Sequence, residues 1–181
     1  CYIVGDKLDY LHIVEKTPIH LLFIDRINKI FPKARIVLVK RDGRDTVTSL
    51  VHVGQNPNAW WKGAPNTIKK ATQLWKSYAK ASIYCATCYN PYIINYGCIV
   101  KDTQRELQNL MKYLTLSTTH VMQQVQASKN GKNISIAGVF REGKVGSWKT
   151  FFSKKDIITF NDIASSIFKK YMCMENKQND V

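Results

Sequence analysis

The sequence predicts an α/β protein in which a parallel sheet is flanked by helices. Two short runs of branched and aromatic apolar residues, at 36–39 and 91–96, have the pattern of strands buried in a sheet. Segments with apolar residues at helical spacing precede, separate and follow these runs. Strands that alternate with helices along a chain are typical of parallel sheets, because each helix carries the chain back across the sheet.

The first predicted strand ends in a charged turn, residues 40–45, and apolar residues resume at helical spacing from residue 46 onward. Open parallel sheets bind ligands outside the carboxyl ends of their strands, so Arg41 and Arg44 stand where an anion could be held. Ser49 follows Arg41 by eight residues and could donate a hydroxyl to the same anion. A solvated cluster of salt bridges is the alternative, and this stretch alone favours neither interpretation.

The remaining elements follow from capping signals and apolar periodicity. Thr17 as N-cap and Pro18 in the first turn predict a helix that ends at Phe31. Ser153 with Asp156 forms a capping box. Further helices are expected at 67–84, at 118–127 and from Ser153 to about residue 172. Another is expected to begin at Thr103, which forms a capping box with Glu106. Residues 134–152 are expected to form a loop, and the polar end of the chain to fray.

The composition limits the class of partner. A net charge of +14, from 27 Lys and Arg against 13 Asp and Glu, predicts an anionic partner without choosing among nucleic acid, acidic membrane, polyanionic sugar and nucleotide. No nucleic-acid-binding motif is present, so nucleic acid is not expected. No apolar stretch approaches the roughly 18 residues of a membrane span. Five cysteines cannot all pair within the chain, and Cys85 and Cys88 lack the second ligand pair of a zinc site, so no metal is expected.

Three segments together resemble the sulfotransferases that use 3′-phosphoadenosine-5′-phosphosulfate (PAPS). They are "EKTPIH…FPKARIVLVKRDGRDTVTSL", "PYIINYGCIVKDTQRELQNLMKYL" and "REGKVGSWKTFFS". The resemblance covers residue 15 to about residue 172, and it rests on the order and spacing of all three segments. It implies a nucleotide-kinase-like fold, of the P-loop NTPase type, with a partial sulfotransferase domain at 1–172 and a polar tail at 173–181.

The resemblance also implies a donor site. The 3′-phosphate would be held by Arg41, Ser49, Arg141 and the backbone around Gly143, which suits a phosphate because Arg offers planar donors and Gly allows close backbone approach. Tyr96 matches the family's tyrosine near the adenine, although a core tyrosine would give the same pattern. The donor would be PAPS and the product 3′-phosphoadenosine-5′-phosphate (PAP).

The sequence departs from the family pattern in several places. Residues 97–99 replace Glu-Asp-Leu, Glu142 replaces a basic residue, and Ser147 replaces Asp. Each change is expected to weaken the site. The strand and loop that cradle the 5′-phosphosulfate are not found in the sequence, and the chain begins with Cys1, so we expect a fragment that binds PAP weakly and is inactive alone. The residues of the family's dimer motif also differ, and the sequence leaves oligomeric state and localisation open.

The implied reaction transfers a sulfuryl group to a hydroxyl or amine of a small-molecule or glycan acceptor. Glu15 and His20 are the candidates for the general base, and Glu15 is preferred because Pro18 occupies the place next to Lys-Thr where the cytosolic members carry His. Lys16 would stabilise charge on the transferred group. The alternative function is a degenerate or truncated relative that binds a nucleotide or polyanion without activity. A nucleotide kinase is disfavoured because no GxxxxGK[ST] loop is present.

Overall fold

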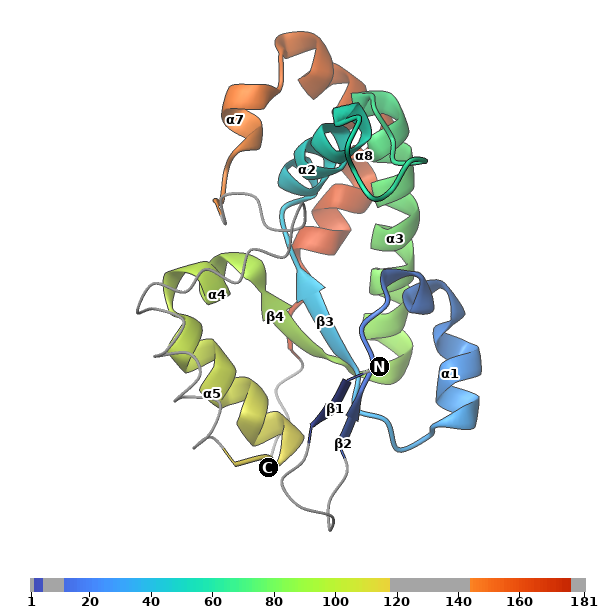
Figure 1. The fold of residues 1–181 in the computed structure, drawn as a ribbon, viewed down its shortest axis with the longest axis vertical. Coiled ribbons are helices and arrows are strands. Elements are labelled where there is room, and N and C mark those ends of the chain that lie inside the picture. The colour runs from blue at the N-terminus through green and yellow to red at the C-terminus, as the bar shows by residue number, and fades with distance from the viewer. Residues whose placement is uncertain (1, 5–11, 118–143, 177–181) are drawn as a thin grey trace. The chain divides into compact units, whose positions relative to one another are not determined.

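The computed structural model describes residues 2–4, 12–117 and 144–176, which divide into two compact units, Cys1–Ala34 and Arg35–Val181. The fold is mixed α/β and mostly helical, which confirms the predicted class (Figure 1). In chain order, the described elements are β1 (Tyr2–Val4), β2 (His12–Val14), the 3-10 helix η1 (Pro18–Phe23), α1 (Ile24–Ile30), β3 (Val37–Lys40), α2 (Gly43–Gln55), α3 (Ile68–Tyr89), β4 (Tyr92–Asn95), α4 (Tyr96–Lys101), α5 (Thr103–Leu114), α7 (Trp148–Phe151) and α8 (Lys154–Met172).

The first unit contains a short antiparallel pair followed by a helical segment. β1 pairs with β2 in a register that sets Ile3 opposite Ile13. The predicted helix after Pro18 is present, but its first six residues form the 3-10 helix η1 before α1 begins. Thr17 stands at the N-cap position, but its side chain does not cap the helix: the hydroxyl donates to the Glu15 carboxylate and accepts no hydrogen bond from the helix's orphan N–H groups.

The second unit is built on a parallel pair of strands, β3 and β4, whose register runs from Val37 opposite Tyr92 to Lys40 opposite Asn95. The sequence-based expectation that the first strand is buried is wrong at Val39, which is 58% exposed. Lys40 is buried instead, with 7% of its surface exposed. Its ammonium donates to two backbone carbonyls at the end of α8, those of residues 172 and 174, which compensates the burial of the charge.

The core of this unit lies among α2, α3 and α8. α3 and α8 run side by side and α2 packs against α3 (Figure 1). The indole of Trp75 on α3 is central: its centroid lies 5.6 Å from the Phe160 ring and 5.4 Å from the Tyr171 ring. A side chain at Gly43, where α2 begins, would overlap the same indole. The glycine therefore lets the start of α2 approach the core closely.

Two helices follow β4, and their caps differ in part from the prediction. α4 begins directly after the strand, and the Asn95 side chain accepts from its first turn. The expected capping box of Thr103 and Glu106 is wrong: Asp102 caps α5, while the Thr103 hydroxyl donates to the carbonyl of Ile99. The hydroxyl has a nearer acceptor in the preceding helix and is not available to α5. The predicted helix at 118–127 lies outside the described residues.

The C-terminal helix matches the sequence closely. α8 begins after the capping box of Ser153 and Asp156, as predicted, and ends at Met172. The expected fraying of the polar end, residues 175–181, does not apply to Asn176, because its side-chain amide both accepts from the N–H of Ile93 (2.6 Å) and donates to its carbonyl (3.0 Å). This amide pairs with β4 as a neighbouring strand would. The division into a domain at 1–172 and a tail remains a prediction.

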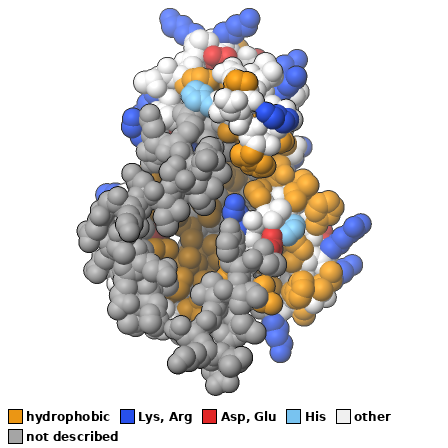
Figure 2. Space-filling view, viewed as in Figure 1, with side chains coloured by type: hydrophobic (Ala, Val, Ile, Leu, Met, Phe, Trp, Pro, Cys, Tyr) orange, Lys and Arg blue, Asp and Glu red, His pale blue; other side chains and the backbone are white. Residues whose placement is uncertain are grey.

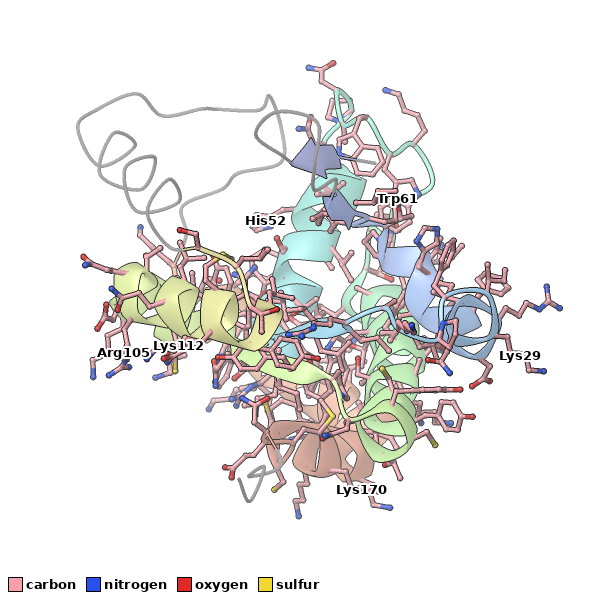
Figure 3. The ribbon with its side chains drawn as sticks, turned by 90° about the horizontal axis from the view of Figure 1, so that it is seen from below. Lys29, His52, Trp61, Arg105, Lys112 and Lys170 are labelled. Carbon is pink, nitrogen blue, oxygen red and sulfur yellow. The ribbon has the colours of Figure 1, made fainter. Side chains whose placement is uncertain are left out.

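The basic residues of the described chain are spread over the surface. Figure 2 shows Lys and Arg side chains scattered over this face rather than gathered in one patch. Arg105 and Lys112 on α5 and Lys170 on α8 lie at the outside of their helices (Figure 3). These charges are typical of solvated helix faces, so the site of an anionic partner must be located from individual contacts.

Within residues 2–4, 12–117 and 144–176, no helix has both the length and the apolar character that crossing a membrane requires.

We expect Phe160→Ala to lower the free energy of unfolding by about 3–5 kcal/mol, because it leaves a cavity beside Trp75 in the centre of the core. Urea denaturation measures the change. Ile158→Ala on the same helix is the control, since Ile158 is 60% exposed, and it should change the free energy by about 0.5 kcal/mol or less. Similar losses for the two variants would show that α8 does not pack as described.

Candidate functional site

The carboxyl ends of β3 and β4 bring Arg41 and Tyr96 together. The two strands end level with each other, because Lys40 pairs with Asn95, so the next residue of each strand lies at the same edge of the sheet. The guanidinium carbon of Arg41 lies 4.6 Å from the centroid of the Tyr96 ring. This is a cation–π contact, and it holds the guanidinium over the ring.

Further contacts hold Arg41 at the end of its strand. Its backbone N–H donates to the hydroxyl of Tyr171 (3.4 Å), and its Nη2 donates to the carbonyl of Lys144 (3.3 Å). Burial is the main cause that raises the pKa of Tyr171, so the phenol is protonated at neutral pH and accepts as a neutral group. The Nε of Arg41 is buried and has no hydrogen-bond partner among the described residues. An unpaired buried donor is costly, and an anionic oxygen would satisfy it.

Arg44 has a different environment from Arg41. Its Nε and Nη2 donate to the two carboxylate oxygens of Asp42 at 3.0 and 2.6 Å. Its guanidinium carbon also lies 3.8 Å from the ring centroid of Trp148. The salt-bridge interpretation of the charged turn therefore applies to Arg44, whereas Arg41 forms no ion pair with a carboxylate in the described part of the chain.

Ser49 lies on α2, half-buried, two turns beyond the helix start. It lies seven positions after the N-cap Asp42, which at 3.6 residues per turn places both on one face of the helix. Arg141 and Gly143, the other predicted phosphate ligands, lie outside the described residues, as does Glu142.

Asp45 joins α2 to the segment at residues 144–148, and the sequence analysis did not single it out. Its side chain is buried, at 1% exposure. It accepts hydrogen bonds from the N–H of Gly146 (2.7 Å), the hydroxyl of Ser147 (3.1 Å) and the N–H of Trp148 (3.0 Å). From the sequence alone, Asp45 is an ordinary acidic residue in the first turn of a helix, where acidic side chains are favoured. No local signal could reveal partners that lie more than 100 residues away.

Two of the departures from the family pattern can be located. Ser147 donates its hydroxyl to Asp45, which a carboxylate at that position could not do at neutral pH. Residues 97–99 form the first turn of α4, where the Asn95 side chain supplies the cap and no acidic residue is present. The first departure therefore makes a contact within the site, and the second leaves the end of β4 without a carboxylate.

The candidate bases lie close together in the first unit. The Thr17 hydroxyl donates to Oε1 of Glu15 at 2.5 Å, and Nδ1 of His20 lies 3.7 Å from the same oxygen. The hydrogen bond from Thr17 is the largest cause that lowers the pKa of Glu15, and the charge of His20 acts in the same direction. Glu15 is therefore ionised at neutral pH. Lys16 between them is exposed.

The described residues contain no group of three or more His, Cys, Asp or Glu side chains that could hold a metal ion.

In comparisons with known proteins, the model of a family described as the sulfotransferase family matches residues 4–120. No curated protein and no solved structure gives a significant match. The matched region contains Glu15, Arg41 and Tyr96 and ends before the segment that Asp45 binds.

We expect Thr17→Val to raise the pKa of Glu15 toward its ordinary value, because the variant lacks the donating hydroxyl. A lowered pKa means that the contact stabilises the folded chain above the ordinary pKa of Glu and that this contribution is lost as the pH falls through the lowered pKa. An NMR titration of the Glu15 carboxyl measures the change. Thr159→Val, whose hydroxyl donates to a carbonyl on α8, is the control. An unchanged Glu15 pKa in Thr17→Val would contradict the assignment.

Proposed function

The chain belongs to the sulfotransferase family, and from that premise we propose that it moves a sulfuryl group from PAPS to a hydroxyl or amine of a small-molecule or glycan acceptor. The observation that carries the proposal is the position of the Arg41 side chain and its unpaired donor. Its guanidinium lies against Tyr96 at the carboxyl end of a parallel strand, with a buried Nε that has no partner among the described residues. Ligands of open parallel sheets bind at this edge.

In the proposed donor site, Arg41 binds the 3′-phosphate. A guanidinium offers planar, charge-assisted donors to a phosphate, and the cation–π contact with Tyr96 orients them before the ligand arrives. Ser49 adds a neutral hydroxyl donor, and Arg141 with the backbone around Gly143 completes the set. Tyr96 has one ring face toward Arg41, and we place the adenine near this tyrosine. The proposal includes a nucleotide-kinase-like fold of the P-loop NTPase type around this sheet.

The proposed chemistry is an in-line displacement at sulfur. The acceptor oxygen or nitrogen attacks the sulfur, the bond from sulfur to the 5′-phosphate oxygen breaks, and PAP leaves. Glu15 takes the proton of the acceptor, for which it must be ionised, as its lowered pKa ensures at neutral pH. Lys16 stabilises negative charge that develops on the transferred group.

The Glu15–His20 contact bears on the choice of base. His20 directs Nδ1 toward Glu15, so its Nε2 is the atom that could accept a proton if His20 were the base. Glu15 remains the preferred base, and in that case His20 orients the Glu15 carboxylate. Because the two groups touch, the effects of removing them should not be additive.

A second candidate function is nucleotide binding without transfer. The observation that favours it is the first turn of α4, where residues 97–99 replace Glu-Asp-Leu and no acidic side chain is present. A site that retained Arg41 and Ser49 could bind PAP while lacking turnover. A donor-dependent sulfation assay with a panel of acceptors, run beside PAP binding, distinguishes the two functions.

For the donor site, we expect Arg41→Ala to weaken PAP binding by about 2 kcal/mol or more, because charge-assisted contacts are lost. Ser49→Ala should cost about 1 kcal/mol, since it removes one neutral donor. Isothermal titration calorimetry measures both values. Arg105→Ala is the matched control, because this arginine is 60% exposed on α5 and points away from the other helices (Figure 3). Equal affinity of wild type and Arg41→Ala would refute the site.

For the base, we expect Glu15→Gln, made in a full-length protein that carries the 5′-phosphosulfate loop, to reduce turnover by roughly 100-fold or more with little change in PAP affinity, and His20→Asn to reduce it less. Steady-state sulfation rates measure the ranking, and calorimetry with PAP measures the affinity. Asp25→Asn, an exposed acidic residue of α1, is the control. The opposite ranking would assign the role of base to His20.

A further inference from the structure

We propose that Asp45 is a positioning residue of the donor site: it fixes the segment at residues 144–148 on α2, and through this segment it fixes the guanidinium of Arg41. The inference rests on the proposed function, because it takes Arg41 as the ligand of the 3′-phosphate. Asp45 itself touches neither the donor nor the acceptor in this proposal.

Hydrogen-bond donors of the segment at residues 144–148 surround the Asp45 carboxylate, as the donors of a loop surround a bound anion. The carboxylate is buried, and its three donors are the Gly146 N–H, the Ser147 hydroxyl and the Trp148 N–H. No Lys, Arg or His within the described residues forms an ion pair with it. Donated hydrogen bonds therefore compensate the burial of the charge, and losing them would leave a buried charge unsatisfied.

The backbone of the segment is shaped for this contact. Gly146 has φ of +83°, in the left-handed region that favours glycine, and Ser147 follows in the right-handed helical region. Alternation between these two regions turns successive N–H groups toward one point and forms a concave anion-binding nest. Here the anion in the nest is the side chain of Asp45, so the segment's conformation and its attachment to α2 depend on the same residue.

The same segment touches the donor site at Arg41. The carbonyl of Lys144, two residues before Gly146, accepts from Nη2 of Arg41. At the other end of the segment, Trp148 lies over Arg44, which is anchored by Asp42. Asp45 lies between these two contacts and holds the middle of the segment. With the segment in place, Nη2 is engaged, the guanidinium lies against Tyr96, and Nε is the buried donor without a partner.

The consequence is preorganisation of Arg41. Without the Asp45 contacts, the carbonyl of Lys144 would no longer be held beside Nη2, and the guanidinium would gain rotational freedom and water. Binding of a phosphate would then have to order the side chain, which weakens affinity. A purely structural role for Asp45 would lower stability without acting specifically through Arg41.

The experiment measures PAP affinity by calorimetry and amide hydrogen exchange by NMR on the 181-residue chain, for wild type, Asp45→Asn, Asp45→Ala, Arg41→Ala and the double variant Arg41→Ala/Asp45→Ala. We expect Asp45→Ala to lower PAP affinity about tenfold and Asp45→Asn to lower it less, because Asn keeps one acceptor oxygen. The amides of Gly146 and Trp148 should exchange faster in both variants. Asp162→Asn, an exposed position on α8, is the control for loss of an acidic residue.

The double-variant cycle separates positioning from stability. If Asp45 acts through Arg41, its replacement should change PAP affinity little once Arg41 is already Ala. Additive losses would overturn the inference, as would unchanged exchange at Gly146 and Trp148. Unchanged affinity in Asp45→Ala beside a clear loss in Arg41→Ala would overturn it while leaving the proposed function intact. No loss in Arg41→Ala would instead refute the donor site itself. Should Asp45→Ala not fold, Ser147→Ala, which removes one donor from the same carboxylate, replaces it in the cycle.

Discussion

The parallel register of β3 and β4 is the constraint on which the rest of the candidate site depends. With Lys40 opposite Asn95, both strands end at one edge, and the next residue of each, Arg41 and Tyr96, is brought into contact. A slip of one strand by one residue would also move that strand's side chains to the opposite face of the sheet. The register therefore sets the position of the guanidinium and, through the start of α2, the position of Asp45 as well.

The C-terminal helix α8, although more than 100 residues away in the sequence, contacts the end of β3 and stabilises it. Lys40 donates to carbonyls at the end of α8, and the Tyr171 hydroxyl accepts from the backbone of Arg41. Residue 176 continues the support by pairing with β4 at Ile93. The two charged residues at the end of β3 thus differ in role: Lys40 is turned inward to hold α8, and Arg41 remains for an anion.

The two Arg and two Asp side chains of the charged turn have distinct partners. Asp42 caps α2 and binds Arg44, and Arg44 in turn lies against Trp148. Asp45 is satisfied by the nest at residues 146–148, so neither carboxylate neutralises Arg41. If these two Arg and two Asp side chains all paired with one another, no guanidinium would remain for an anion. Withdrawing both carboxylates to other partners is what leaves Arg41 with anion-binding capacity.

The sequence by itself determined the local features of this protein. It predicted the α/β class, both strands of the parallel pair, the start of α8 with its capping box, and the location of Arg41 at the end of a strand, because periodicity and caps are properties of neighbouring residues. The closeness of Glu15 and His20 is local in the same sense. Only the tertiary structure decided that Lys40 is buried and Val39 exposed, that Arg44 and not Arg41 pairs with Asp42, and that Asp45 binds the segment around Ser147. These outcomes depend on which polar groups are left without a hydrogen-bond partner when the helices and strands pack. Several of the partners lie more than 100 residues apart, beyond the reach of any local pattern.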